Sequence, residues 1–245
     1  MPGPDGGPDH VLGEGDPRTI VPAGDARTIV PGGDARTIVP GGDARTIVPG
    51  GAAAPAAIPA EIFTAAVDAF AAGQRLDMRS LAQQLGVARA TLYRRAGNRE
   101  HLLDEMLWWR ARRLLVDQVQ ATVALAGTER LVAVIGGVLR AIATDRPLRA
   151  FLESDPETAL RLLTGTRSTV HRGMATALEK LIDLERRRGC FEASLDTPTL
   201  AYAIVRISEG FLYADPIADR APDIDRAVTL IEALLVGLTR HSTPV

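Results

Sequence analysis

From Ile58 onward, apolar residues recur with the 3.6-residue period of an amphipathic helix, and no convincing period-two alternation appears. Gly73 and Gly86 follow two of the apolar runs, at the position where glycine commonly ends a helix. Asp77 can cap the start of the second helix. The body is therefore predicted to be all-α, with helices at Ile62–Phe70, Met78–Leu85, about Arg89–Ala96, Asn98–Leu115, 128–144, 156–188, 197–213 and 223–240.

Residues 1–57 differ, because they hold most of the glycine and proline. Four copies of a nine-residue unit follow one another: GDPRTIVPA from Gly15, then GDARTIVPG from Gly24, Gly33 and Gly42. The unit lacks the Gly and Asp spacing of a calcium-binding β-roll. Its Ile-Val pair buries too little surface to offset about 1–2 kcal/mol of backbone entropy per residue. We expect a disordered tail with transient Pro-Gly turns.

Each copy carries one threonine, preceded by Arg and followed by Ile-Val, at Thr19, Thr28, Thr37 and Thr46. Two interpretations stay open. The threonines are substrates of a Ser/Thr kinase, and each phosphate would add up to two negative charges. Alternatively, the repeat arose by replication slippage in GC-rich DNA and has no selected function.

Composition excludes several classes. The net charge is −2, so nucleic-acid binding would need a local basic patch. Cys190 is the only cysteine, which rules out a disulfide within the chain. The N-terminus lacks the features of a signal peptide, and the longest apolar run, Leu131–Leu139, is too short to cross a membrane. We expect a cytoplasmic, nucleoid-associated protein.

Gly86-Val87-Ala88 joins two short predicted helices, which is the spacing of a helix-turn-helix unit. Apolar residues such as Leu81 and Leu92 would lock the pair and leave one face of the second helix free for a DNA major groove. Guanidinium and hydroxyl groups suit phosphates and base edges. Without the turn, the same residues would indicate only a solvated basic face. The polar positions are Arg89, Thr91, Tyr93, Arg94, Arg95 and Arg99.

The stretch LAQQLGVARATLYRRAGNREHLLDEML (81–107) resembles the DNA-binding region of TetR-type transcriptional regulators. Within that family, LYRRAGNREHLLDEMLW, ETALRLLT and RISEGFLYADPIADRAPDIDRAV are most similar to the QsdR-type group. The resemblance implies a repressor that binds double-stranded operator DNA as a homodimer and is released by a small-molecule effector. It divides the chain into the tail (1–57), a DNA-binding domain (58–107) and a ligand-binding and dimerisation domain (108–245).

The resemblance also assigns residues. Base edges are expected to be read by Arg89, Ala90 and Arg94. Phosphates are expected to be bound by Thr91, Tyr93 and Arg95, although Thr91 occupies a position that also touches bases. Arg99 replaces the family's lysine at the start of the next helix and is also expected to contact DNA. Two positions depart from the family pattern: Ala88 stands where a capping serine is usual, and Ala96 stands where a packing phenylalanine is usual. We expect both to loosen the local geometry.

The second domain offers two larger sets. Pocket candidates combine bulk with polar groups: Trp109, Arg112, Phe151, Leu162, His171, Met174, Tyr202 and Glu209. Two apolar stripes would form a four-helix bundle with a second subunit, as the family does, or else belong to the core of one chain: Ile204, Ile207, Phe211, Val228, Ile231 and Leu235.

An enzyme is not indicated, because the four histidines are isolated in sequence and no nucleophile elbow, phosphate loop or metal-ligand spacing appears. We expect no cofactor and no bound metal. A second functional hypothesis remains: a helical dimeric scaffold that has lost DNA binding and whose repeat tail recruits a partner.

Overall fold

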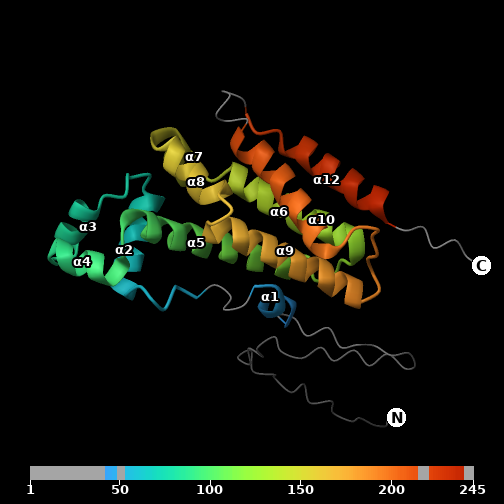
Figure 1. The fold of residues 1–245 in the computed structure, drawn as a ribbon, viewed down its shortest axis with the longest axis horizontal. Coiled ribbons are helices and arrows are strands. Elements are labelled where there is room, and N and C mark those ends of the chain that lie inside the picture. The colour runs from blue at the N-terminus through green and yellow to red at the C-terminus, as the bar shows by residue number, and fades with distance from the viewer. Residues whose placement is uncertain (1–41, 49–52, 215–220, 240–245) are drawn as a thin grey trace, which may run out of the picture. The chain divides into compact units, whose positions relative to one another are not determined.

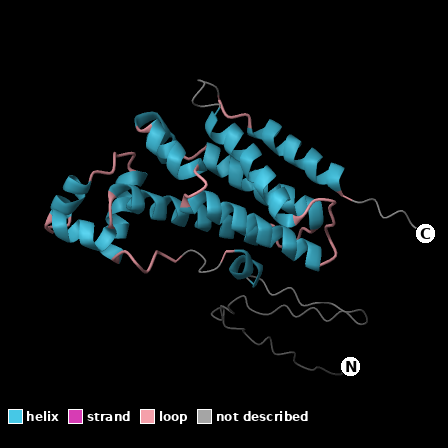
Figure 2. Cartoon of the chain, in the orientation of Figure 1, coloured by secondary structure: helices cyan, strands magenta, loops and turns pink. Residues whose placement is uncertain are grey.

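The computed structural model describes residues 42–48, 53–214 and 221–239, apart from the side chains of residues 42, 43, 45 and 214. In these ranges the regular structure is helical (Figure 2), and one isolated bridge pairs Ala193 with Thr239. The all-α prediction is therefore confirmed for the described residues. The disorder predicted for 1–41 lies outside them.

The helices are α1 (Gly42–Ile47), α2 (Ala60–Ala71), α3 (Met78–Gln84), α4 (Arg89–Ala96), α5 (Arg99–Ala121), α6 (Gly127–Ala143), α7 (Arg146–Ser154), α8 (Pro156–Thr164), α9 (Thr169–Arg187), α10 (Thr197–Glu209), the π-helical turn η1 (Gly210–Ala214) and α12 (Ile224–Leu238). The predicted positions of α2, α3, α4, α6, α10 and α12 agree with these bounds to within a few residues, whereas α5 continues past the predicted end at Leu115 to Ala121. The segment between α6 and α10 differs from the prediction.

One predicted helix, 156–188, is two, and α7 was not expected. The first break falls at Gly165, whose extended backbone ends α8, and Ser168 then starts α9 by accepting a hydrogen bond from the backbone of His171 at 2.9 Å. Asp145 caps α7 in the same way through Leu148, at 3.0 Å. Apolar periodicity continues through the break at Gly165, so only the local capping reveals it.

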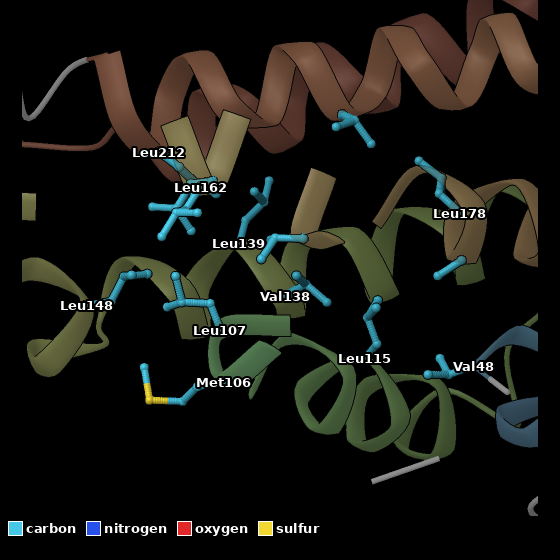
Figure 3. Close-up of a cluster of buried hydrophobic side chains, with 14 of the residues drawn as sticks. Val48, Met106, Leu107, Leu115, Val138, Leu139, Leu148, Leu162, Leu178 and Leu212 are labelled. Atoms are coloured by element: carbon cyan, nitrogen blue, oxygen red, sulfur yellow. The ribbon is translucent and has the colours of Figure 1, made fainter. Parts of the chain in front are cut away.

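The body has two helical groups: α2 to α4 form the first, and α6 to α12 form the second. Helix α5, green in Figure 1, connects them. It packs against α2 of the first group and against α6, α8 and α9 of the second. Leu102, Leu103 and Met106 are fully buried at its N-terminal half. Farther along, Leu107 and Leu115 enter the buried cluster of the second group (Figure 3). A shift of α5 would therefore change the packing in both groups.

An ion pair is buried in the second group. Arg130 on α6 and Glu185 on α9 are both 0% exposed, and their side chains meet at 2.9 Å. The other oxygen of Glu185 accepts from the backbone of Gly127 at 2.7 Å. Gly127 has φ +59° and lies so close to the Cys190 carbonyl that a Cβ would be 2.3 Å from its oxygen. The carboxylate thus fixes the start of α6 where only glycine fits.

The fourth copy of the repeat is helical, which differs from the predicted disorder. It forms α1, which packs against α5 and α9 (Figure 1) and buries Ala44, Ile47 and Val48. A six-residue helix is not stable alone, so the surface of α5 and α9 holds it. Thr46 is exposed at this helix, and the other three repeat threonines lie outside the described residues.

Candidate nucleic-acid interface and ligand cavity

Helices α3 and α4 form a tight pair whose joint contains a left-handed residue. Gly86 has φ +65°, which a side chain would disfavour. Asp77 caps α3 by accepting from the Ser80 backbone at 2.8 Å, and hydrogen bonds from Ser80 hold the pKa of this carboxyl below its usual value. Leu81 of α3 and Leu92 of α4 are buried in the joint. The helix-turn-helix geometry predicted from the sequence is present.

The outer face of α4 is accessible to a ligand. Arg89, Ala90, Tyr93, Arg94 and Arg95 are exposed. Among the described residues, Arg89 and Arg94 form no ion pair. Arg95 lies 3.8 Å from a Glu61 oxygen, but both side chains are more than half exposed, so this contact is weak. Thr91 is half-buried beside this face. The guanidinium groups of Arg89 and Arg94 therefore do not take part in ion pairs that stabilise the fold.

Arg99 behaves differently from the arginines of α4. Its Nε donates to the Leu76 carbonyl at 2.7 Å, and its Nη1 meets Asp155, between α7 and α8, at 2.8 Å. Burial acts to raise the pKa of Asp155, but hydrogen bonds from Thr158 and Arg99 outweigh it and hold the pKa below its usual value. Arg99 therefore joins the helix-turn-helix unit to the second group in this conformation. Sequence reasoning missed Asp155, which lies far along the chain.

The two departures from the family pattern are visible locally. Ala88 begins α4 without a side-chain hydrogen bond, as expected for a residue that cannot cap. Ala96 is 1% exposed, so the small side chain is still enclosed in the core. The α4 helix therefore keeps its packing and lacks only its N-terminal cap.

A cavity of about 440 Å³ lies inside the second group, between α5, α6, α9 and α10. Its wall is mainly aliphatic, and many of its side chains belong to the cluster in Figure 3, including Leu107, Leu115, Val138 and Leu139. Volume and lining are those of a site for a small molecule with a substantial apolar part.

Polar groups of the wall are mostly paired. His171 Nδ1 lies 2.6 Å from one Glu209 oxygen, and Arg206 meets the other at 2.6 Å. Burial raises the pKa of the Tyr213 hydroxyl, which therefore stays protonated and can donate. Arg110 pairs with Asp145 at 2.5 Å. The polar part of the wall thus combines paired side chains, the Tyr213 hydroxyl and the charged residues Arg113 and Asp117.

The predicted pocket residues separate into two sets. Trp109, His171, Met174 and Glu209 line the cavity, whereas Arg112, Phe151, Leu162 and Tyr202 do not. Arg112 donates instead to the Ala53 carbonyl, and Tyr202 is 53% exposed on α10. The aliphatic wall of α6 and the Arg110–Asp145 pair were not expected, because nothing in the sequence distinguishes them from core and surface.

The predicted dimer residues also separate. Ile204, Ile231 and Leu235 are buried by their own chain, at 1%, 1% and 0% exposure, and leave no surface for a partner. Ile207, Phe211 and Val228 are half-buried. The exposed large apolar residues of α10 and α12 are Tyr202, Leu230 and Val236. The apolar stripes are thus largely core of one chain, and a dimer surface would lie on the outer faces of these helices.

Comparisons with known proteins agree with this arrangement. Residues 126–236 match the family model described as the tetracyclin repressor-like C-terminal domain. The structure of the R. erythropolis transcriptional repressor QsdR, from the TetR family, is similar with a TM-score of 0.65 and 30% identity, covering 74% of this chain and 94% of that one. The transcriptional regulator FadR from Bacillus subtilis, solved with stearoyl-CoA, has a TM-score of 0.52 and 18% identity, covering 73% and 98%. No curated protein sequence matches the chain.

A helix-turn-helix unit joined by one long helix to a helical cavity domain defines a transcriptional regulator. The chain belongs to the TetR family. Within the described residues, no group of His, Cys, Asp or Glu side chains is placed to hold a metal ion, and no helix is long and apolar enough to cross a membrane.

Proposed function

We propose that the protein is a repressor that binds operator DNA as a homodimer and is released by a small-molecule effector. The observation that carries this proposal is the exposed face of α4, where Arg89 and Arg94 form no ion pair among the described residues. Guanidinium groups of this kind bind guanine edges and phosphates. Arg95 and Tyr93 extend the face toward the DNA backbone.

Dimerisation follows from the reading of paired half-sites, about 34–36 Å apart, by two recognition helices. The outer faces of α10 and α12 support it, because they expose Tyr202, Leu230 and Val236. Exposed large apolar residues on two neighbouring helices are compatible with a protein interface.

The effector is expected to be an acyl-type molecule. The cavity accommodates an apolar chain, and His171 and Tyr213 can hydrogen-bond a carbonyl or hydroxyl group at its polar end. The fold shared with FadR, which was solved with stearoyl-CoA, is compatible with such a ligand.

Helix α5 provides the coupling between cavity and DNA. Leu107 and Leu115 face the cavity, while Arg99, at its first turn, holds Leu76 beside α3 and pairs with Asp155. A ligand that moves α5 or α8 would change the position of α4 and hence the half-site spacing. The coupling requires a difference in effector affinity between the DNA-bound and free states.

The test is a salt-controlled shift assay with operator DNA. Arg94→Ala together with Arg95→Ala should abolish specific duplex binding and leave dimerisation and thermal unfolding unchanged. Arg187→Ala, an exposed arginine on α9, is the matched control and should bind as wild type. Unchanged operator affinity in the double variant would instead favour the scaffold hypothesis.

A further inference from the structure

The fourth repeat is seated in a groove between α5 and α9. Ile47 and Val48 pack there and border a hollow whose other walls include Trp108 of α5 and Gly173, Thr176 and Ala177 of α9. Both apolar side chains are 1% exposed. The Ile-Val pair that looked too small to fold by itself is thus buried on a preformed surface.

The groove depends on a glycine. A Cβ at Gly173 would lie 2.4 Å from the Trp108 ring, so the indole rests directly on the α9 backbone. Arg112 lies over the same ring, 5.9 Å from its centroid, and donates to the carbonyl of Ala53, which follows the repeat. The floor and one side of the groove are therefore built by side chains that contact the bound segment or support it.

Ile47 also belongs to the wall of the large cavity. Ile47 and Ala177 line both the cavity and the groove, so they form the partition between the two. Withdrawal of α1 would remove one side of that partition and open the cavity toward the groove. Occupancy of the groove and access to the cavity are coupled by this one side chain.

Three features make the docked segment exchangeable. Helix α1 has six residues and is too short to persist once it leaves the surface. Its anchors are Ala44, Ile47 and Val48. The copies that begin at Gly24 and Gly33 repeat the nine residues of the docked copy without change, and the copy at Gly15 keeps its Ile-Val pair.

We propose that the groove between α5 and α9 is a binding site for the peptide motif Ala-Arg-Thr-Ile-Val, and that the copies beginning at Gly24, Gly33 and Gly42 are tethered, interchangeable ligands which close the effector cavity. Tandem copies keep the local concentration of the motif high, so a vacated groove is refilled by a neighbouring copy. An apolar effector that needs the space beside Ala177 competes with Ile47. The regulatory consequence rests on the proposed effector role of the cavity, whereas the peptide site does not.

The first measurement uses Trp108 as a reporter in the full-length chain with Trp109→Phe, because the chain has two tryptophans. Replacing the isoleucine of every copy with aspartate (Ile20, Ile29, Ile38 and Ile47) should raise the acrylamide quenching constant of Trp108 about twofold or more. Ile47→Asp alone should stay close to wild type, because another copy refills the groove. Equal quenching in the wild type and the fourfold variant would overturn the proposal, as would equal quenching in the single and fourfold variants.

The second measurement keeps both tryptophans. Fluorescein-labelled GDARTIVPG peptide should bind the fourfold variant about fivefold or more tightly than wild type, measured by anisotropy, because the wild-type groove holds a tethered competitor. The peptide GDARTDVPG is the matched control and should not bind. Thr176→Glu at the exposed rim should weaken peptide binding, and Thr176→Ser should not. Equal binding of the two peptides, or of one peptide to both proteins, contradicts the proposal.

The third measurement concerns the cavity. The apolar fluorophore 1-anilinonaphthalene-8-sulfonate should associate several-fold faster with the fourfold variant than with wild type, and excess GDARTIVPG should reverse the difference. Unchanged association would show that Ile47 does not close the cavity. These assays contain no DNA. The peptide site can therefore be confirmed even if the operator assay fails, and operator binding can be confirmed even if the peptide assays fail.

Discussion

Arginine stands in opposite surroundings in two regions of this molecule. On α4, Arg89 and Arg94 are exposed and form no ion pair among the described residues, whereas Arg130 on α6 is 0% exposed and pairs with the equally buried Glu185. An exposed guanidinium keeps its donors for a ligand, while a buried one is committed to its partner. The same residue type is therefore a candidate DNA contact in one region and a structural element in the other.

The largest effect is expected from breaking the buried pair. Glu185→Ala leaves Arg130 buried without its carboxylate and should lower the free energy of unfolding by about 3–5 kcal/mol. Urea denaturation measures this loss. Glu192→Ala, an exposed glutamate, is the control and should change stability by less than about 0.5 kcal/mol. A loss below about 1 kcal/mol for Glu185→Ala would mean that the buried pair does not organise α6 and α9.

For the exposed arginines of α4 we expect a loss of DNA affinity instead of a loss of stability, and Arg89→Ala tests this. It should cost about 1–3 kcal/mol of operator affinity, because one guanidinium is lost from a base edge, while leaving stability unchanged. Binding isotherms at fixed salt and thermal unfolding of the same samples separate the two quantities. A loss of stability without a loss of DNA affinity would mean that Arg89 stabilises the fold and does not contact DNA.

Arg99 is intermediate between the exposed arginines of α4 and the buried Arg130, because its side chain is 23% exposed and paired with Asp155. Asp155→Asn should lower stability by about 1 kcal/mol at neutral pH. Because the folded state lowers the pKa of Asp155, the pair stabilises above the ordinary value of 3.8 and its contribution is lost as the pH falls through the lower folded value. The difference between wild type and variant should shrink below about pH 4 in urea titrations. A difference independent of pH would point to packing instead of charge.

The smallest effect is expected from the repeats that are not docked. Deleting residues 2–41 leaves the fourth copy in place and removes neither the arginines of α4 nor the buried Arg130. Operator affinity should change by less than about threefold, or about 0.7 kcal/mol. A larger loss, measured in the same shift assay, would give the tail a direct part in DNA binding.

The two helices of the helix-turn-helix unit could be predicted from the sequence because their signals are local. Asp77, Gly86 and the apolar spacing around Leu92 fix two helices and their joint within about twenty residues of chain. The break beside Ser168 is also local, but the continuous apolar period masked it, and α7, which Asp145 caps, was left outside the predicted helices.

The remaining features depend on residues that are distant in sequence. Arg99 with Asp155, and His171 with Glu209, become neighbours only when the helices pack. Likewise, the composition of the fourth repeat correctly indicates that it cannot fold alone, but it cannot show that α5 and α9 offer a surface to Ile47. Pattern reasoning therefore succeeds where the partner is nearby and fails where the fold supplies it.

The central claim, that α4 reads paired DNA half-sites, is tested most directly by selecting bound sequences from random duplex DNA with the full-length protein. The account predicts enrichment of a two-fold symmetric site whose halves lie about one helical turn, or a multiple of it, apart. The same selection with Arg94→Ala and Arg95→Ala should enrich nothing. Enrichment of no sequence by the wild type, or of the same site by both proteins, would contradict the account.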